Sequence, residues 1–246
     1  MNPEEVKEIE NAGFCSWPAD EQQDLDRIIV RFSNGYTKRA NSATVLQQQK
    51  GNFSSLVKQC EHYYQKKGLP CTFRIPSFSQ NEALDNYLEH KSYTLLDHSL
   101  VMHKPIEKQS LSTINFQLRT PEQWIDSFCR LNSIDINNQH HHLKILNRIK
   151  DKMLLAVLVE HGQEVACGIA VISNGYCGIF DIFSHKNFRK LGHATKLLNG
   201  LLNWAISNGA THSYIQVVAN NQPAINLYKK LGYKTCYEYH YRMKLK

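Results

Sequence analysis

The chain has 246 residues, which is longer than most single domains, so two compact units are expected. Hydrophobic residues make up 42% of the chain and charged residues 21%, a composition that supports a sizeable core and excludes extensive disorder. The formal net charge of +7 favours an anionic partner, but Lys and Arg are scattered rather than gathered in a tract, so no nucleic-acid partner is expected.

The amino-terminal sequence MNPEEVKEIE is acidic and lacks the apolar stretch of a secretory signal. The longest apolar run, Met153 to Val159, is far shorter than the ~20 residues of a membrane span, so no membrane partner is expected. The seven cysteines form no C-x-x-C pair, which is typical of reduced thiols. Together these features predict a soluble, cytoplasmic protein.

The first half of the chain contains apolar runs that alternate with turn residues. The predicted elements, in order, are strands at 26–32 and 43–47, a helix at 53–66, a strand at 71–75, a helix within 81–93 and a closing strand at 93–103.

A polar segment with one proline, Lys104 to Ser110, is predicted to link the two halves. After it, Thr120, Pro121 and Gln123 stand where a capping box needs an N-cap threonine, an N1 proline and an N3 glutamine, which predicts a helix that ends near Leu131. We therefore expect one domain over residues 1–110 and a second over 111–246.

The second half begins with three apolar runs of strand length, separated by turns at Gly162 and Gly175, which predict two successive hairpins. The third strand leads through the turn Arg189-Lys190-Leu191-Gly192-His193-Ala194 into a helix that ends at Gly209. A strand, a glycine turn and a helix in this order hold phosphate well, because unpaired N–H groups and the positive end of the helix dipole face the anion. A strand, a helix and a closing strand follow.

Two motifs in this half resemble those of the GCN5-related N-acetyltransferase (GNAT) superfamily. Arg189-x-x-Gly192-x-Ala194 matches the R/Q-x-x-G-x-G/A turn of the superfamily, and Val217-x-x-x-Asn221-x-x-Ala224-x-x-Leu227-Tyr228 resembles its second signature. The motifs occur in the order of the family, and the resemblance covers about residues 116–246. It implies an α/β (α+β) fold in which two GNAT-like domains each contain a mixed, mostly antiparallel sheet flanked by helices.

The resemblance also implies roles for individual residues. The residues expected to surround the pyrophosphate of coenzyme A are Arg189, Leu191, Gly192, His193, Ala194 and Thr195. Asn221 would contact the pantetheine arm or orient the splayed strands around it, although an asparagine before a helix is also an ordinary N-cap. Tyr228 would protonate the departing thiolate, and its alternative is a core tyrosine on a helix face.

A general base is needed as well, because an alkylamine is mostly protonated at neutral pH. Asp181 is the first candidate, with a partly exposed strand residue as the alternative, and His212, Glu238 and His240 are weaker candidates. A strand amide at a bulge would hold the developing oxyanion. The run His140 to His142 resembles a metal site, but adjacent helix positions point in different directions, so no metal is expected.

An internal repeat aligns Asn81–Tyr93 with Asn221–Tyr233 at an offset of 140 residues. At the same offset, Asn52 replaces the turn glycine and Leu88 replaces the tyrosine. We interpret the first half as a degenerate GNAT-like domain; chance similarity between two amphipathic helices is the alternative.

The function implied by the resemblance is transfer of acetyl from acetyl-CoA to a primary amine of a small molecule or peptide, by direct attack. The alternative is a non-catalytic acyl-CoA sensor or assembly module. The donor-rich segment Arg31 to Ser42, together with Trp17, is expected either to contribute to the acceptor pocket or the interdomain surface, or to form an ordinary hairpin with its turn at Asn34-Gly35. The sequence does not indicate the amine or the oligomeric state.

Overall fold

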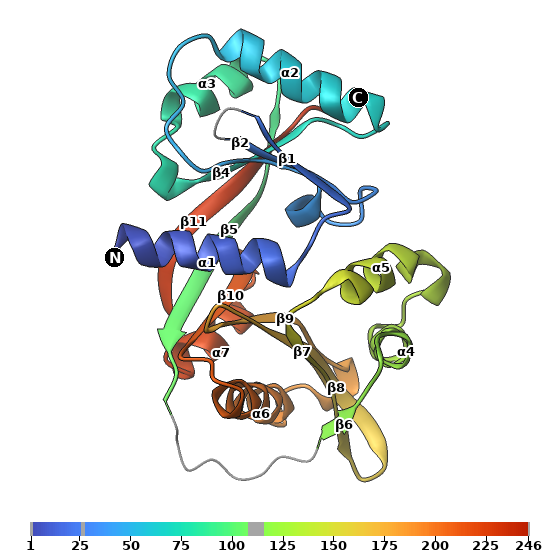
Figure 1. Ribbon diagram of the computed structural model, residues 1–246. Coiled ribbons are helices and arrows are strands. Elements are labelled where there is room, and N and C mark those ends of the chain that lie inside the picture. The colour runs from blue at the N-terminus through green and yellow to red at the C-terminus, as the bar shows by residue number, and fades with distance from the viewer. Residues whose placement is uncertain (1, 26–27, 108–115, 246) are drawn as a thin grey trace. The chain divides into compact units, whose positions relative to one another are not determined.

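The computed structural model describes residues 2–25, 28–107 and 116–245 (Figure 1). The chain forms two compact units. Unit 1 contains Met1–Pro18, Met102–Gln216 and Pro223–Lys234, and unit 2 contains Ala19–Val101, Val217–Gln222 and Thr235–Lys246. Each unit therefore combines segments from both halves of the sequence. The domain boundary predicted between residues 110 and 111 lies in 108–115, outside the described residues.

Unit 2 contains a mixed sheet whose strands follow the order β1-β2-β3-β4-β11. The strands are β1 (Glu21–Leu25), β2 (Ile28–Phe32), β3 (Ala43–Val45), β4 (Thr72–Pro76) and β11 (Lys234–Met243). The β3–β4 pair is parallel, whereas β1–β2, β2–β3 and β4–β11 are antiparallel. Helices α2 (Phe53–Lys66) and α3 (Glu82–His90) add Val57, Tyr64, Leu84 and Leu88 to the core of this unit.

Unit 1 contains a sheet in the order β10-β9-β8-β7-β6. Its strands are β6 (Phe116–Leu118), β7 (Lys152–Glu160), β8 (Gln163–Ser173), β9 (Tyr176–Ser184) and β10 (His212–Val218). Its helices are α1 (Pro3–Ser16), α4 (Pro121–Asn132), α5 (His140–Arg148), α6 (His193–Ser207) and α7 (Gln222–Lys230). The β9–β10 pair is parallel, whereas β6–β7, β7–β8 and β8–β9 are antiparallel. In the view of Figure 1, α1 lies above these strands and α6 below them.

The turns of unit 1 have the backbone geometry that their residues predict. His161 and Gly162 have φ values of 51° and 79°, and Asn174 and Gly175 have values of 49° and 80°. A tight two-residue hairpin turn requires a positive φ at both central residues. Asparagine and glycine adopt this left-handed conformation most readily. Both predicted hairpins are therefore confirmed.

The predicted capping box is also present at the start of α4. The Thr120 N–H donates to Gln123 Oε1 at 3.1 Å, and the Gln123 N–H donates to Thr120 Oγ1 at 3.4 Å. The two residues satisfy each other's backbone donors, so the helix begins at Pro121 as predicted.

Several elements were not predicted from the sequence: α1, β1, α5 and β6. The start of α1 carries a signal that could have been used, because Asn2 Oδ1 accepts from the Glu4 N–H at 3.1 Å and Pro3 stands in the first turn. The predicted link begins too early, since β5 (Thr94–Pro105) includes Lys104 and Pro105. Residues 26 and 27, within a predicted strand, lie outside the described residues.

The internal repeat recurs in the structure. Helices α2 and α6 begin at residues 53 and 193, α3 and α7 span 82–90 and 222–230, and β5 and β11 begin at 94 and 234. Each pair keeps the offset found in the sequence. Chance similarity between two helices does not explain three equivalent pairs of elements in the same order.

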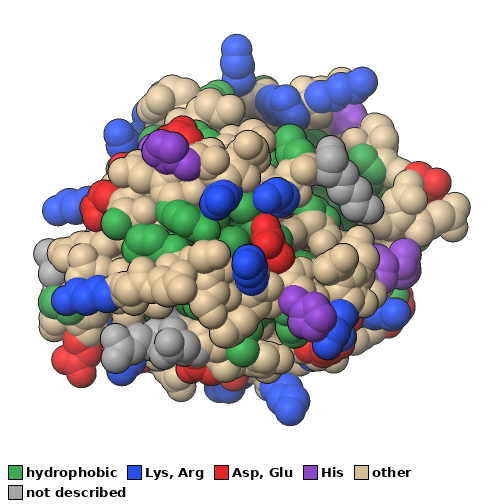
Figure 2. Space-filling model, turned by 90° about the horizontal axis from the view of Figure 1, so that it is seen from above, with side chains coloured by type: hydrophobic (Ala, Val, Ile, Leu, Met, Phe, Trp, Pro, Cys, Tyr) green, Lys and Arg blue, Asp and Glu red, His purple; other side chains and the backbone are tan. Residues whose placement is uncertain are grey.

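On the face shown in Figure 2, Lys and Arg side chains are interspersed with hydrophobic, acidic and neutral side chains. This face therefore carries no single basic stripe. In the part of the chain that the structure describes, no helix has both the length and the apolar character needed to cross a membrane.

Candidate active site

The turn before α6 leaves the start of the helix open to a ligand. Gly192 has a φ of 82° and stands at the N-cap position without a side chain that could accept a hydrogen bond. A Cβ atom added there would meet no described atom within 4 Å. The first intrahelical bond recorded at this end runs from the Lys196 N–H to the Gly192 carbonyl at 3.0 Å. The N–H groups of the first turn are therefore available to an anion.

Arg189 and Lys190, at the beginning of this turn, are exposed. Lys190 also has a positive φ, of 62°, so two left-handed residues lie close together in the turn. Arg189 Nε donates to the Ser184 carbonyl at 3.3 Å, and its guanidinium lies 5.7 Å from the centre of the Phe183 ring. These contacts hold the positive charge of Arg189 beside the start of the helix.

The equivalent turn in unit 2 is closed by a side chain. At the start of α2, Asn52 Oδ1 accepts hydrogen bonds from the N–H groups of Ser54 at 3.0 Å and Ser55 at 3.4 Å. An asparagine cap thus occupies the donors that remain open before α6. This difference agrees with the interpretation that only the second copy retained an anion-binding turn.

The pairing of strand β9 with its neighbours is irregular around Asp181. On one side, Ile169 of β8 pairs with Phe180 and Cys167 pairs with Phe183, so β9 contains one extra residue. Asp181 has a φ of 49° in this bulge. On the other side, the parallel register with β10 is recorded only from Tyr176 to Ile179, although β9 continues to Ser184. The β9–β10 register therefore ends at Ile179, two residues before the bulge at Asp181.

A glycine in β8 accommodates the bulge. A Cβ atom on Gly168 would lie 2.4 Å from Ile182 Cδ1, closer than side chains tolerate, and 3.3 Å from Leu197 and Leu201 of α6. The absence of a side chain at residue 168 thus leaves room for the Ile182 side chain beside the bulge.

Asp181 contacts a buried histidine that the sequence did not single out as a site residue. Its Oδ2 atom lies 3.1 Å from His142 Nε2, with the histidine side chain 1% exposed and the aspartate side chain 28% exposed. The imidazole is surrounded by aromatic rings, with centroids 5.6 Å away for Trp17, 5.7 Å for Trp124 and 5.5 Å for Phe128. The partial burial of Asp181 fits a catalytic carboxylate, and it equally fits a partly exposed strand residue without a catalytic role.

His142 was considered in the sequence only as part of the run of three histidines. In the structure, the rings of His140 and His141 lie 3.7 Å apart, whereas His142 is directed into the core of unit 1. Its apolar neighbours on α5, Ile145 and Leu146, are buried on the same helix and supply the periodicity that could have identified it.

Tyr228 lies on α7 with 8% of its surface exposed. Burial raises the pKa of its hydroxyl group to about 12. The Tyr228 ring lies 6.1 Å from that of Tyr233, whose hydroxyl is 2.7 Å from Ser213 Oγ. Tyr228 thus remains protonated at neutral pH, as a proton donor must.

The remaining candidates have separate environments. Asn221, in unit 2, is exposed directly before α7, and its N–H donates to the Val218 carbonyl at 2.9 Å. Glu238 lies 2.7 Å from His98, and His240 lies 2.7 Å from Asp85. His212, the first residue of β10, stacks on the rings of Tyr176 and His103.

The segment Arg31 to Ser42 connects the antiparallel strands β2 and β3, as the hairpin interpretation requires. Asn34 and Gly35 are both left-handed, and Asn41 Oδ1 accepts from the N–H groups of Ser33 and Gly35 at 2.7 and 2.9 Å. The donors of this loop are thus partly used within the loop. A role in the acceptor pocket stays a prediction.

The sequence of this chain is similar to those of known acetyltransferases. The family model described as "Probable histone acetyltransferase Rv0428c C-terminal" matches residues 4–242. The "Uncharacterized N-acetyltransferase YobR" of Bacillus subtilis is 28% identical over 98% of this chain and 99% of its own length.

Two solved structures have a similar fold. A GCN5-related N-acetyltransferase from Kribbella flavida superposes with a TM-score of 0.72 at 9% identity, over 100% of this chain and 96% of its own. A tandem GNAT protein from the clavulanic acid biosynthesis pathway has a TM-score of 0.63 at 10% identity, over 94% of this chain and 86% of its own. The family match is nearly full-length and includes the turn before α6. The chain therefore belongs to the family of the probable histone acetyltransferase Rv0428c C-terminal region, within the GNAT superfamily.

Proposed function

We propose that this chain transfers the acetyl group of acetyl-CoA to a primary amine by direct attack. The observation that carries the proposal is the open start of α6, where Gly192 leaves both the first-turn N–H groups and the space beside them accessible. A diphosphate fits such a site because it needs several donors and a positive field at close range. The N-acetyltransferase name of the 28% identical relative supports the same chemistry.

In this proposal the turn and β9 bind different parts of acetyl-CoA. The backbone of Leu191, Gly192, His193, Ala194 and Thr195 receives the pyrophosphate, with Arg189 adding charge. The part of β9 around the bulge at Asp181, beyond the register with β10, pairs with the amide groups of the pantetheine arm, as an added strand would. Asn221 is a further proposed contact of that arm.

Acetyl-CoA supplies a thioester, whose carbonyl carbon accepts the amine nitrogen. Asp181 takes one proton from the attacking amine, and a β9 backbone N–H at the bulge stabilises negative charge on the carbonyl oxygen. As the C–N bond forms and the C–S bond breaks, Tyr228 gives its hydroxyl proton to the sulfur. Its raised pKa keeps that proton in place until the thiolate develops. His142 orients the Asp181 carboxylate.

Calorimetric titration with acetyl-CoA tests the binding site, and saturable binding with one site per chain is expected. Release of free CoA, measured with a thiol reagent across a panel of small-molecule and peptide amines, tests the enzyme. Binding without CoA release from any amine would favour the non-catalytic sensor. Absence of acetyl-CoA binding would contradict both functions.

The base is tested by Asp181→Asn, which preserves the shape of the side chain but removes its proton acceptor. We expect kcat to fall by about 100-fold with little change in the KM for acetyl-CoA. His142→Gln should lower kcat less than Asp181→Asn, because histidine only orients the carboxylate. The matched control is Asp126→Asn on α4, whose exposed side chain pairs with Arg130. Equal kcat in Asp181→Asn and the control would assign Asp181 to the fold alone.

A further inference from the structure

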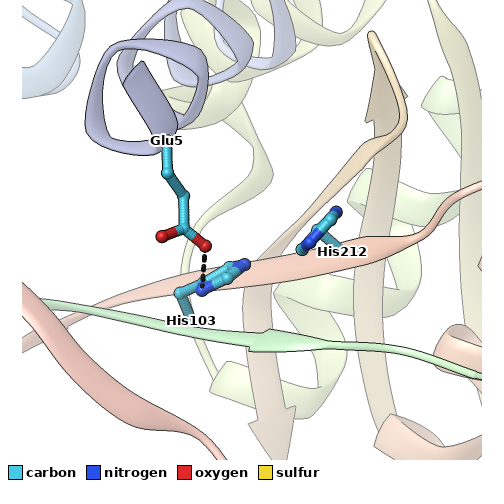
Figure 3. Close-up of side chains that lie close together, drawn as sticks. All are labelled: Glu5, His103 and His212. Carbon is cyan, nitrogen blue, oxygen red and sulfur yellow. Dashed lines mark ion pairs between the residues drawn. The ribbon is translucent and has the colours of Figure 1, made fainter. Parts of the chain in front are cut away.

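Three side chains with metal-binding atoms lie close together in unit 1, and none of them belongs to the turn before α6. They are Glu5 of α1, His103 of β5 and His212 of β10. One carboxylate oxygen and one ring nitrogen from each histidine lie within 4.8 Å of one another. Figure 3 shows the carboxylate of Glu5 above the ring of His103, with the ring of His212 beside them.

Their contacts already bring the donor groups together. Glu5 Oε1 lies 3.3 Å from His103 Nδ1, and the two imidazole rings are 5.2 Å apart with an angle of 20° between their planes. The side chains are partly buried, with 11% of His103 and 29% of Glu5 exposed. The cluster is therefore screened from water but remains within reach of a small ion.

One atom of this cluster lacks a partner. His103 Nε2 is buried and makes no hydrogen bond to any residue that the structure describes. A buried imidazole nitrogen without a partner is costly, which makes it a candidate for an interaction with a ligand. Metal ions bind the uncharged form of an imidazole ring through such a nitrogen.

The surroundings of His212 are suited to orienting a ligand. Its ring stacks on Tyr176 at 5.0 Å, and its Nδ1 atom lies 2.9 Å from Thr211 Oγ1. An interaction at one ring nitrogen fixes the ring and leaves the other nitrogen to bind a metal ion, as in many histidine sites. Thr211 and Tyr176 thus act as supports around the cluster.

We propose that Glu5, His103 and His212 bind a divalent zinc-type metal ion, with water as the remaining ligand. Two histidines and one glutamate are a ligand set that Zn²⁺ uses at about 2.0–2.2 Å, so donors around one ion lie within about 4 Å of each other. For a tetrahedral site the longest donor spacing must shorten by roughly 1–1.5 Å, which side-chain rotation supplies. The three ligands come from residues 5, 103 and 212, so the ion would fasten α1 to β5 and β10.

The test uses the full chain after treatment with a chelator. Titration with Zn²⁺ by calorimetry should give one site per chain, and Co²⁺ should give the visible absorption bands of a four-coordinate histidine site. His212→Ala and Glu5→Gln should each weaken Zn²⁺ binding by at least about 10-fold. The matched control, His62→Ala, removes an exposed histidine from α2 in unit 2 and should bind Zn²⁺ as the unchanged chain does.

Folding is monitored separately by circular dichroism and by the melting temperature without metal. The unchanged chain should gain thermal stability on addition of Zn²⁺, whereas Glu5→Gln, which can keep a hydrogen bond to His103, should fold but gain less. Unchanged Zn²⁺ affinity in both His212→Ala and Glu5→Gln would overturn the proposal. Lack of a site in the unchanged chain would overturn it equally, and would leave the Glu5–His103 contact as a metal-free attachment of α1. Neither result bears on acetyl-CoA binding.

Discussion

At the scale of single residues, the chemistry of the proposed site depends on a missing side chain at Gly192 and on a hydroxyl group at Tyr228. Gly192 lacks a Cβ atom, which permits its φ of 82° and keeps the space in front of α6 open. Its counterpart Asn52 has a side chain that caps the start of α2. Tyr228 keeps a buried hydroxyl group where the first copy has Leu88, which is fully buried. Single substitutions can thus separate the two copies functionally.

Gly192→Ala tests the turn. Because alanine at a left-handed φ is strained by roughly 1–2 kcal/mol and its methyl group fills the approach to the helix start, we expect acetyl-CoA to bind at least about 10-fold more weakly. Calorimetry measures the affinity and thermal melting measures the stability.

The matched control for this substitution is Gly209→Ala. Gly209 has a φ of 91°, has no described atom within 4 Å of an added Cβ and lies at the other end of α6. It should lose similar stability while acetyl-CoA affinity stays unchanged. Equal losses of affinity in the two variants would attribute the effect to helix strain and not to the turn.

Tyr228→Phe tests the proton donor. Without the hydroxyl group the thiolate leaves unprotonated, so we expect kcat to fall by about 100-fold while affinity for acetyl-CoA changes little. Steady-state kinetics with the best amine of the panel provides both numbers. Tyr233→Phe is the control, since it removes a hydroxyl group 2.7 Å from Ser213 and should cost about 1 kcal/mol of stability without a specific loss of kcat.

At the scale of elements, the way each helix begins decides whether its first turn serves the fold or a ligand. Helix α4 begins with a complete capping box, α2 with Asn52, and α6 with a glycine that caps nothing. Helix α6 compensates by burying Leu197, Leu198, Leu201 and Leu202. Packing can therefore hold α6 in place while its first-turn donors stay free.

Thr120→Ala tests the capped start of α4. The loss of the hydroxyl acceptor should destabilise the chain by about 1 kcal/mol, read as the free energy of unfolding in denaturant. Gln123→Ala, which removes only the reciprocal bond, should cost less. Acetyl-CoA affinity should be unaffected in both variants. A stability loss for Gln123→Ala larger than for Thr120→Ala would contradict the assignment of the cap.

At the scale of the whole molecule, distant parts of the sequence complete each compact unit. In unit 2, β11 pairs with β4, with Tyr239 opposite Pro76 and Met243 opposite Thr72. The pairing is reinforced by Asp85 of α3, which accepts from Arg242 Nε at 2.9 Å and lies 2.7 Å from His240 Nε2. The last strand of the chain thus supplies both a sheet partner and the counter-charge of a helix in the first half.

Asp85 gives this contact a pH dependence. Burial by itself would raise the pKa of Asp85, but the hydrogen bonds from His240 and Arg242 outweigh it and hold the pKa below its usual value. A carboxylate with a lowered folded-state pKa stabilises the chain above the unfolded-state pKa of about 3.9 and loses that stabilisation as the pH falls below it.

Asp85→Asn should therefore lower the free energy of unfolding at neutral pH by roughly 2–3 kcal/mol and flatten its decline below about pH 4. Denaturant unfolding at a series of pH values measures both effects. Glu89→Gln is the control, because Glu89 shares Arg242 as a partner at 3.4 Å but is 63% exposed. It should change stability by less than about 1 kcal/mol. A pH dependence unaltered by Asp85→Asn would contradict the role of this aspartate.

Much of the fold followed from local patterns in the sequence. The α2 boundaries, the two hairpin turns of unit 1 and the start of α4 were predicted from periodicity, Gly and Asn placement and a capping box. The elements that escaped prediction carried weaker patterns: α1 has few apolar residues, and β1 consists of exposed and half-buried side chains. Propensity is a poor guide where packing from elsewhere in the chain stabilises the element.

The turn at Gly192, the order of the motifs and the repeat were determined by the sequence itself, because each depends on residues close together in the chain or on equal spacing between copies. Only the tertiary structure decided that His142 meets Asp181, that Glu5 joins His103 and His212, and that β11 completes unit 2. These contacts join residues that are far apart in sequence, and no local pattern encodes which long-range partners a packed core brings within a few ångströms.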